Sequence, residues 1–329
     1  MPEVLVIANI LHRKEGPFAD ALRAAGFSIR FPKDGFRQLT ESELAAELGD
    51  AVATIAGSEP YTPAIFANNP QLRAIARTGV GFDSIDLPSA AKANVPVCVT
   101  PGANHDAVAE QTFALLLAVG RHVIANHLMV AGGGFTRAIP IPMRGKTLGI
   151  VGFGRIGKAV AKRAVAFGMR VIAFDPAPLP DSEDVWRTSF DRVLDESDYI
   201  SLHAPMIPAT KNLINADAIA RMKQGVRIVN TARGGLIDEI ALAAALRSGH
   251  VAAAGLDVFA NEPPIGSPML EAPNVTFAPH VAGLDSTSVV EMGLMAAQNI
   301  VDLYEGRFPA ERIANADDVR NFKWDLNRS

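Results

Sequence analysis

The sequence predicts an α/β protein built from two doubly wound parallel-sheet domains. Three observations lead to this prediction. The 329 residues are enough for two hydrophobic cores of ordinary size. Short apolar runs with strand character alternate with helical patterns along most of the chain, as they do in parallel sheets. A glycine-rich turn in the middle of the chain joins one apolar run to a helical segment, which is typical of a doubly wound sheet that binds a dinucleotide.

The first hundred residues alternate strands and helices without a long interruption. Each expected strand is a short apolar run, and each expected helix has apolar residues at helical spacing. The expected strands are 4–8, 28–31, 51–56, 72–77 and 97–99, and the expected helices are 18–25, 42–48, 63–67 and 87–93.

A long helix is predicted over residues 106–130, and it ends at the glycines 132–134. Six strands follow, which is the number in a complete doubly wound dinucleotide-binding sheet. A last amphipathic helix is expected over 286–304, and its periodicity alone does not say on which domain it packs. The six strands are 147–151, 170–174, 199–202, 226–230, 252–256 and 275–277.

The glycine-rich turn after strand 147–151 has the pattern Gly152-x-Gly154-x-x-Gly157. Gly152 permits the tight turn, Gly154 lets the backbone approach a pyrophosphate, and Gly157 allows close packing of helix on strand. The helix over 155–167 would then present its free N–H groups to the phosphates. Asp175 stands 18 positions after Gly157, where a carboxylate accepts hydrogen bonds from the adenosine ribose. The sequence therefore predicts a bound dinucleotide.

Asp175 also indicates which dinucleotide binds. A carboxylate at the ribose repels a 2′-phosphate, and the residues that follow, Pro176 to Pro178, include no arginine to receive one. The predicted cofactor is NAD rather than NADP.

Composition and charge limit the other classes of partner. A formal net charge of −4 gives no basic footprint for nucleic acid or an anionic membrane. No apolar run approaches the length of a membrane span, and the N-terminus lacks the basic region of a signal peptide. Cys98 is the single cysteine, which excludes an intrachain disulfide and fits a reducing compartment. We expect a cytoplasmic protein that acts on a small molecule.

Hydride transfer to or from carbon also needs a group that handles a proton and a group that orients the substrate. Arg233, Glu262 and His280 each follow one of the last three predicted strands, and ligands of such sheets lie beyond the carboxyl ends of the strands. A carboxylate beside His280 would favour the imidazolium, and a guanidinium can fork onto a substrate carboxylate. Each residue taken singly could equally form a structural salt bridge. His203, at another strand end, is expected to line the cofactor.

The remaining histidines do not predict a metal site. His122 and His127 are five residues apart, rather than the three or four that place two ligands on one helix face, and no cysteine supports them. His12, His105 and His250 are expected in loops or on the surface.

Over nearly its whole length the chain resembles the D-isomer-specific 2-hydroxyacid dehydrogenases, and among them the phosphoglycerate dehydrogenase-like branch. The resemblance implies that Arg233, Glu262 and His280 are catalytic, and that Arg233 anchors the substrate together with amides near Val80 and Gly81. The motifs that carry it are 77–86, 151–157, 222–238, 255–263 and 278–283. The implied cofactor contacts are Thr100, Gly152, Gly154, Arg155, Ile156, Gly157, Asp175, Ala204, Thr210, Thr231, Ala232, Arg233, Asp257, His280 and Gly283.

The resemblance also implies how the domains are organised. A flavodoxin-like substrate domain would combine residues 1–101 with 286–329, a Rossmann NAD-binding domain would comprise 102–285, and a cleft would lie between them. Relatives commonly form homodimers through the region of 106–142. We expect no regulatory domain of the kind that longer phosphoglycerate dehydrogenases have, and the polar tail, 311–329, has no predicted role.

The predicted activity is NAD-dependent interconversion of a D-2-hydroxy acid and its 2-keto acid, with D-3-phosphoglycerate or hydroxypyruvate and glyoxylate as candidates. Two alternatives on the same scaffold are an NAD-sensing corepressor-like regulator and a formate-oxidising enzyme, although the latter resemble this chain with glutamine in place of Glu262. Arg77 ends strand 72–77, and it either binds the far end of the substrate or pairs with an acid such as Asp83.

Overall fold

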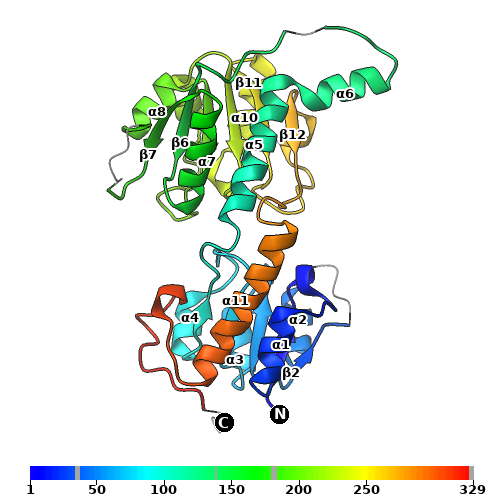
Figure 1. Cartoon of the computed structure of the whole chain (residues 1–329), viewed down its shortest axis with the longest axis vertical. Coiled ribbons are helices and arrows are strands. Elements are labelled where there is room, and N and C mark those ends of the chain that lie inside the picture. The colour runs from blue at the N-terminus through cyan, green and yellow to red at the C-terminus, as the bar shows by residue number, and fades with distance from the viewer. Residues whose placement is uncertain (34–37, 138, 179–183, 326–329) are drawn as a thin grey trace. The chain divides into compact units, whose positions relative to one another are not determined.

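The computed structural model describes residues 1–33, 38–137, 139–178 and 184–325. The chain forms two compact units, which are coloured along the chain in Figure 1. The first unit combines Met1–Asn104 with Leu284–Ser329, and the second is the continuous segment His105–Gly283. The domain boundaries expected from the sequence, after 101 and before 286, fall within a few residues of these divisions.

The first unit contains a five-stranded parallel sheet. Its order is β2-β1-β3-β4-β5, which is the order of flavodoxin-like folds. Each strand overlaps a predicted run and is often shorter, and β1 begins one residue before its run. The strands are β1 (Glu3–Val6), β2 (Ser28–Arg30), β3 (Ala53–Ala56), β4 (Ala74–Arg77) and β5 (Val97–Cys98).

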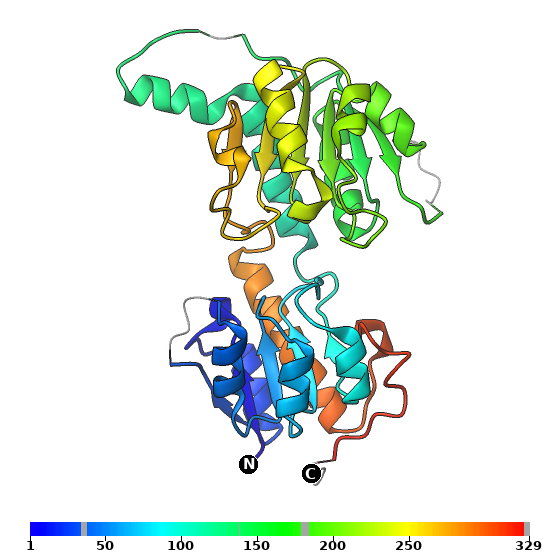
Figure 2. The same cartoon turned by 180° about the vertical axis from the view of Figure 1, so that it is seen from behind.

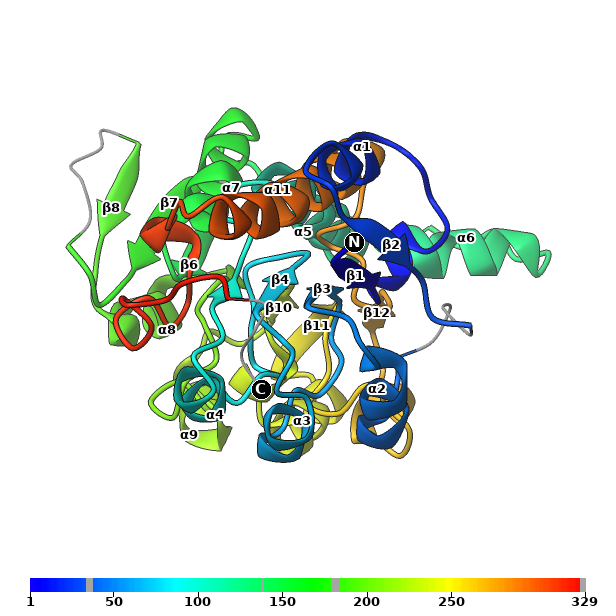
Figure 3. The same ribbon diagram turned by 90° about the horizontal axis from the view of Figure 1, so that it is seen from below.

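Helices cover both faces of this sheet, as Figure 3 shows. Side chains alternate along a strand, so Val4 and Val6 pack with α1 and α11, whereas Leu5 packs with the opposite layer. The first layer is α1 (Pro17–Ala24) and α11 (Ser286–Tyr304), and the second is α2 (Glu41–Leu48), α3 (Pro63–Asn68) and α4 (Leu87–Lys92).

Helix α11 has the bounds that its amphipathic pattern predicts, and it packs on α1 and on β4. The Asp285 side chain caps its first turn by accepting a hydrogen bond from the Ser288 amide at 2.6 Å. The structure therefore assigns this last helix, whose place the periodicity left open, to the first unit.

The polar tail covers the open edge of the first sheet. Residues 312–315 run antiparallel to β5, where the Val99 amide donates to the Arg312 carbonyl and the Ala314 amide donates to the Val97 carbonyl, both at 2.8 Å. Further along, the Trp324 ring contacts the rings of Phe27 and Tyr304 edge-on. The tail thus pairs with the sheet edge at one bridge and also supplies core contacts.

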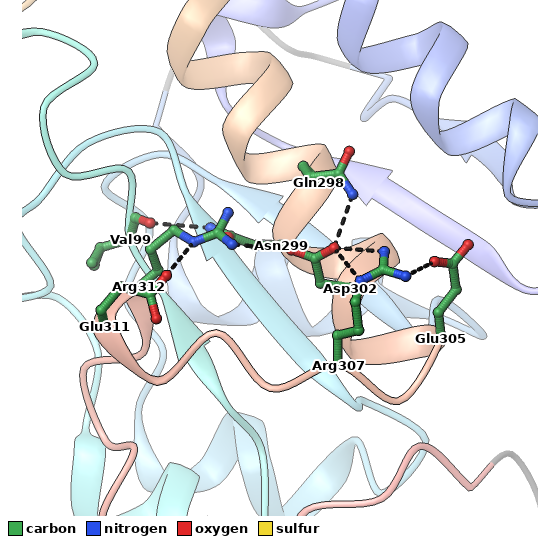
Figure 4. A network of polar contacts seen from close by, with 8 residues as sticks. All are labelled: Val99, Gln298, Asn299, Asp302, Glu305, Arg307, Glu311 and Arg312. Carbon is green, nitrogen blue, oxygen red and sulfur yellow. Dashed lines mark hydrogen bonds and ion pairs between the residues drawn. The ribbon is translucent and has the colours of Figure 1, made fainter.

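A network of polar contacts joins the end of α11 to this tail (Figure 4). Its centre is Asp302, whose side chain is 10% exposed. The Asp302 Oδ1 atom accepts from Gln298 at 2.9 Å and from Arg307 at 2.7 and 3.0 Å, and Oδ2 accepts from Arg312 at 3.1 Å. The outer contacts are Glu305 with Arg307, Glu311 with Arg312, and Asn299 with the Val99 carbonyl.

The second unit contains a seven-stranded parallel sheet of order β12-β11-β10-β9-β6-β7-β8. This is the order of a dinucleotide-binding sheet with one further strand at the β12 edge. The prediction of six strands was wrong, because it missed β8, a three-residue edge strand. The strands are β6 (Thr147–Val151), β7 (Arg170–Phe174), β8 (Val185–Arg187), β9 (Tyr199–Leu202), β10 (Val226–Asn230), β11 (Val251–Leu256) and β12 (Val275–Phe277).

Two layers of helices also cover this second sheet. Buried residues of α5 and α7 pack on one face, and those of α8, α9 and α10 pack on the other. The helices are α5 (His105–Arg121), α7 (Arg155–Ala166), α8 (Phe190–Glu196), α9 (Ala216–Arg221) and α10 (Glu239–Ser248). Short 3-10 turns lie at Asn9–Leu11, Gly234–Leu236, Pro268–Glu271 and Ala310–Arg312.

The single long helix expected over 106–130 is instead two helices. His122 adopts a left-handed conformation, φ +56°, which separates α5 from α6 (Val123–Ala131) with a bend of 61°. Helix α6 extends away from its sheet in both views of Figures 1 and 2, and none of its residues is buried. Within the described ranges, no single helix is long and apolar enough to cross a membrane, and only the bent pair α5 and α6 reaches that limit when taken together.

Candidate active site

The glycine-rich turn lies between the ends of β6 and β9, where the strand order of the second sheet reverses. Gly152 has φ +92°, and a Cβ there would lie 2.6 Å from the His203 carbonyl group. A Cβ on Gly157 would collide with the Gly152 carbonyl oxygen, so that α7 could not approach the turn. These two glycines therefore close the turn and dock the helix.

Gly154 has a different environment. It precedes the first residue of α7, no side chain caps that helix, and a Cβ built on Gly154 would meet no described atom within 4 Å apart from its own chain neighbours. The first-turn amides, beginning with those of Arg155 and Ile156, thus border open space. A pyrophosphate fits such a position, because uncapped N–H groups and the helix dipole attract anions.

Asp175 follows β7 next to this turn. Its Oδ2 atom accepts from the Phe153 amide at 2.7 Å, and Oδ1 accepts from the Ala177 amide at 2.9 Å. Each carboxylate oxygen has a second lone pair, so both oxygens can still accept a hydroxyl hydrogen. The ribose hydroxyls of NAD fit this arrangement.

His203 follows β9 on the other side of the turn. Its Nε2 atom lies 2.8 Å from the Ser201 hydroxyl, whereas the buried Nδ1 atom has no hydrogen-bond partner within the described part of the chain. Burial lowers the pKa of His203 to about 3. The ring is therefore neutral and lies next to Gly152, and its role in lining the cofactor stays a prediction.

The three predicted catalytic side chains follow β10, β11 and β12, which are neighbours in the sheet. The Asn230 side chain holds the backbone at Arg233 in place. Its Nδ2 atom donates to the Arg233 carbonyl at 2.8 Å, and its Oδ1 atom accepts the Ala232 amide at 3.0 Å. Buried Asn230 thus fixes the loop that carries Arg233.

Gly234 brings that loop against the next one. A Cβ on Gly234 would overlap the Phe259 carbonyl and the Ala260 nitrogen, so only glycine permits this approach. On the other side, Glu239 at the start of α10 accepts the Ala260 amide at 2.8 Å and the Ser267 hydroxyl at 2.5 Å. The loop that carries Glu262 is therefore fixed by contacts with the preceding strand–helix connection.

Glu262 and His280 form a direct pair. The Nδ1 atom of His280 lies 2.7 Å from Oε2 of Glu262, and Oε1 accepts the Phe259 amide at 3.0 Å. Burial acts to raise the pKa of Glu262, but the hydrogen bond and charge of His280, the Phe259 amide and the charge of Arg233 together lower it below its ordinary value. Glu262 is therefore ionised beside the imidazole at neutral pH.

The turn around His280 is held by Asp257. The buried carboxylate accepts the Val281 amide at 3.0 Å and the Ala282 amide at 2.8 Å, while the His280 amide donates to the Asp257 carbonyl at 2.7 Å. Burial raises the pKa of Asp257, and the two amides act in the opposite direction. His280 adopts φ +55° here and exposes 49% of its side chain.

The other predicted contacts are spread over both units. In the second unit, the Thr231 hydroxyl lies 2.9 Å from that of Thr112, and Thr210 donates to the Pro205 carbonyl at 2.7 Å. Ala204 lies next to His203, and Gly283 follows the turn that Asp257 holds. Thr100 belongs to the first unit, where its hydroxyl accepts the Gly79 amide at 2.8 Å.

The predicted carboxylate-binding segment also lies in the first unit, directly after β4. Gly79 has φ +137°, and Val80 is 41% exposed. Arg77 donates from Nε to the Gly81 carbonyl at 2.8 Å and so closes the loop on itself. Neither predicted role of Arg77 requires this contact, and the sequence pattern contained no signal for it.

Three residues that shape the site were missed in the sequence. Asn230, Gly234 and Glu239 stand in or next to the motif 222–238, but their roles depend on contacts between loops that are far apart in the chain. Among the described residues, no group of three or more histidine, cysteine, aspartate or glutamate side chains could hold a metal ion.

Comparison with known proteins identifies the second unit. Residues 113–282 match the NAD binding domain of the D-isomer specific 2-hydroxyacid dehydrogenases. The chain is 41% identical over 254 residues to a hydroxypyruvate reductase of Thermotoga maritima, which covers 76% of this chain and 83% of the relative. It is 40% identical over 278 residues to a D-3-phosphoglycerate dehydrogenase of Mycobacterium leprae, which covers 83% of this chain but 53% of that relative.

A solved structure agrees over nearly the whole chain. The crystal structure of the TT0316 protein from Thermus thermophilus has a TM-score of 0.84 and 37% sequence identity, and the match covers 95% of this chain and 99% of that one. The likeness therefore extends through both units, whereas the phosphoglycerate dehydrogenase is about twice as long as the matched part.

Proposed function

Because the chain belongs to the D-isomer specific 2-hydroxyacid dehydrogenase family, we propose that Arg233, Glu262 and His280 are the catalytic residues of this NAD-dependent oxidoreductase. The observation that carries the proposal is the 2.7 Å contact between Nδ1 of His280 and Glu262. It engages one ring nitrogen and leaves Nε2 of a half-exposed ring for proton exchange with a substrate.

In the direction of reduction, NAD in its reduced form supplies the hydride to the carbonyl carbon of a 2-keto acid. His280 holds a proton on Nε2 and donates it to the carbonyl oxygen. Glu262 keeps the ring in one orientation and favours its charged form. In the direction of oxidation, the neutral ring accepts the hydroxyl proton at the same atom.

The substrate needs a site for its carboxylate as well as a proton donor. Arg233 presents a guanidinium for this purpose, and we propose that the amides of Val80 and Gly81 are further substrate-binding groups. Arg77 would contribute to the substrate site from the end of β4. The proposal for Val80 is supported by its exposure, and that for Arg77 by its contact with the Gly81 carbonyl.

The cofactor site would be built from the turn and strand ends of the second unit. The uncapped start of α7 would hold the pyrophosphate, and Asp175 would bind the adenosine ribose. The neutral ring of His203 adds no charge there. The further proposed contacts are Thr100, Gly152, Gly154, Arg155, Ile156, Gly157, Ala204, Thr210, Thr231, Ala232, Arg233, Asp257, His280 and Gly283.

We propose a homodimer that forms through α6. Val123, Ile124, Leu128 and Val130 are 47–64% exposed on a helix with no buried residue. A contiguous apolar helix of this kind is typical of an association surface. Light scattering of the chain and of a Leu128→Glu variant tests the proposal, which predicts a monomer only for the variant.

Location in the cytoplasm stays a prediction from cysteine usage.

The test of the activity is steady-state reduction of glyoxylate, hydroxypyruvate, pyruvate and 3-phosphohydroxypyruvate, followed by the absorbance of NADH. Turnover of at least one of these acids is expected. A regulator that senses NAD on the same scaffold would bind NADH without turnover of any of them, and that result would contradict the proposal. The paired His280 and Glu262 support the enzyme over the regulator.

A further inference from the structure

A buried carboxylate lies at the carboxyl end of the first sheet, outside the catalytic group described above. Glu59 belongs to the segment 57–61, which follows β3 and which we call the Glu59 loop. Strand β1 is flanked by β2 on one side and β3 on the other, so the strand order reverses between β1 and β3. Ligands of doubly wound sheets bind at such a reversal, beyond the carboxyl ends of the strands.

Glu59 is held firmly in this position. Only 3% of the residue is exposed, and its Oε2 atom accepts the Gly57 amide at 2.7 Å. A Cβ on Gly57 would lie 3.0 Å from the other carboxylate oxygen, so the loop folds tightly around the acid. A buried carboxylate is costly unless a cation or hydrogen-bond donors offset its charge.

The loop that contains Val80 and Gly81 adjoins the Glu59 loop at both ends. At one end, Ala56 pairs with Arg77 in the sheet, and the Thr78 amide donates to the Ala56 carbonyl at 3.0 Å. At the other end, the Tyr61 amide donates to the Ser84 carbonyl at 2.8 Å. The proposed substrate-binding segment and the Glu59 loop are therefore held together side by side.

The charge of Arg77 acts on Glu59. Burial raises the pKa of Glu59, while the charge of Arg77 and the Gly57 amide act to lower it. The same two charges act on the buried Tyr61 hydroxyl, which also lies 2.8 Å from the Thr54 hydroxyl. Arg77 therefore ends the strand that pairs with the residue before the Glu59 loop, and that loop itself contains no lysine or arginine.

We infer that Glu59 determines specificity, because its carboxylate offsets the charge of Arg77 and so disfavours substrates with a second anionic group. The inference rests on the proposed function and narrows its substrate to 2-keto acids whose only anion is the carboxylate. A phosphate near Arg77 would lie beside a buried acid and lose much of the attraction of the guanidinium. Glyoxylate and hydroxypyruvate meet this requirement, whereas 3-phosphohydroxypyruvate does not.

The first experiment uses the unmodified enzyme. We expect kcat/KM for hydroxypyruvate to exceed that for 3-phosphohydroxypyruvate by at least about tenfold, the effect of one unfavourable charge contact. Equal values for the two substrates would overturn the inference and leave the proposed function intact. Absence of turnover with every keto acid tested would overturn the proposed function and the inference with it.

The second experiment replaces Glu59 with glutamine, which can still accept the Gly57 amide but carries no charge. The ratio of kcat/KM for 3-phosphohydroxypyruvate to that for hydroxypyruvate should rise about tenfold. The matched control is Asp50→Asn, which removes one negative charge from an exposed residue before the other end of β3. That control should leave the ratio as it is in the unmodified enzyme.

The outcomes separate specificity from structure. If Glu59 only supports the fold, Glu59→Gln will lower kcat/KM for both substrates in the same proportion, and the inference is then wrong. It is also wrong if Asp50→Asn changes the ratio as much as Glu59→Gln does. If Glu59→Gln does not fold, the comparison of substrates in the unmodified enzyme still decides the question.

Discussion

Asp302 and Glu262 both have lowered pKa values and basic partners, but they differ in how many contacts they make and in how exposed they are. Asp302 accepts four hydrogen bonds from Gln298, Arg307 and Arg312, and its side chain is 10% exposed (Figure 4). Glu262 accepts from one amide and from His280, and the two side chains are 36% and 49% exposed.

This difference separates a structural network from a candidate catalytic one. The contacts of Asp302 use its acceptor sites and tie the end of α11 to the C-terminal segment. The contact of Glu262 engages only Nδ1 of His280 and leaves Nε2 for a substrate. A lowered pKa alone does not distinguish the two acids. The available Nε2 atom of His280 is therefore the more informative observation.

His280→Ala should give the largest effect, because it removes the group that we propose exchanges the proton. We expect kcat to fall by about two to four decades, with the dissociation constant of NADH little changed. Single-turnover kinetics and fluorescence titration with NADH measure the two quantities. Turnover close to that of the unmodified enzyme would mean that the pair of Glu262 and His280 is not catalytic and does not differ in role from the Asp302 network.

Glu262→Gln should lower kcat for reduction by about one to two decades. The reason is that the ring of His280 loses the carboxylate that holds its Nδ1 atom and fixes its orientation. Steady-state kinetics of reduction measures this loss. A kcat close to that of the unmodified enzyme would mean that the two residues do not act together.

Asp302→Asn should weaken the first unit and leave turnover near its original value. Burial acts to raise the pKa of Asp302, but Gln298 and the two arginines hold it below its ordinary value. The ionised form therefore contributes stability above pH ~4, and this contribution is lost as the pH falls through the lower folded value. At neutral pH we expect a loss of about 1–3 kcal/mol.

The fluorescence of Trp324 can report this loss, since its ring packs on Phe27 and Tyr304. A Trp186→Phe background removes the signal of the second unit, where Trp186 is 51% exposed. The difference in stability between the unmodified chain and the Asp302→Asn variant should shrink below pH ~4. A large loss of kcat in the folded variant would show that the network has more than a structural role.

Asp175→Ala should have the smallest effect and sharpens the comparison, because Asp175 is intermediate between the two acids. It has one amide on each oxygen, and each oxygen retains an acceptor site. We expect the preference for NADH over NADPH to fall severalfold, up to about tenfold. If the unmodified enzyme already uses both cofactors equally well, Asp175 does not discriminate between them.

The sequence predicts best those elements that carry their own end signals. Helix α11 has the predicted bounds because an amphipathic pattern follows the capping residue Asp285. The break at His122 was missed, since a histidine rather than a glycine takes the left-handed conformation there. Strand β8 was missed because Val185–Arg187 is a short edge strand with no alternating pattern to mark it.

The site divides in a similar way. Strand ends could be found from the apolar runs, and this placed Arg233, Glu262 and His280 at neighbouring positions in one sheet. The contacts between loops could not be found, because the fit of Gly234 against Phe259 depends on two segments that only the folded chain brings together. The role of the C-terminal tail depends in the same way on its pairing with β5.

The discontinuity of the first unit has a consequence for the order in which the chain can fold during synthesis. The second unit is one uninterrupted segment, His105–Gly283, and all of its strands leave the ribosome before α11 does. The first unit lacks α11 and the segment 312–315, which pairs with β5, until these residues appear a few seconds later at ~5–20 residues per second. During that interval the apolar face of β4, which α11 later covers, lacks its helix and can associate with other apolar surfaces.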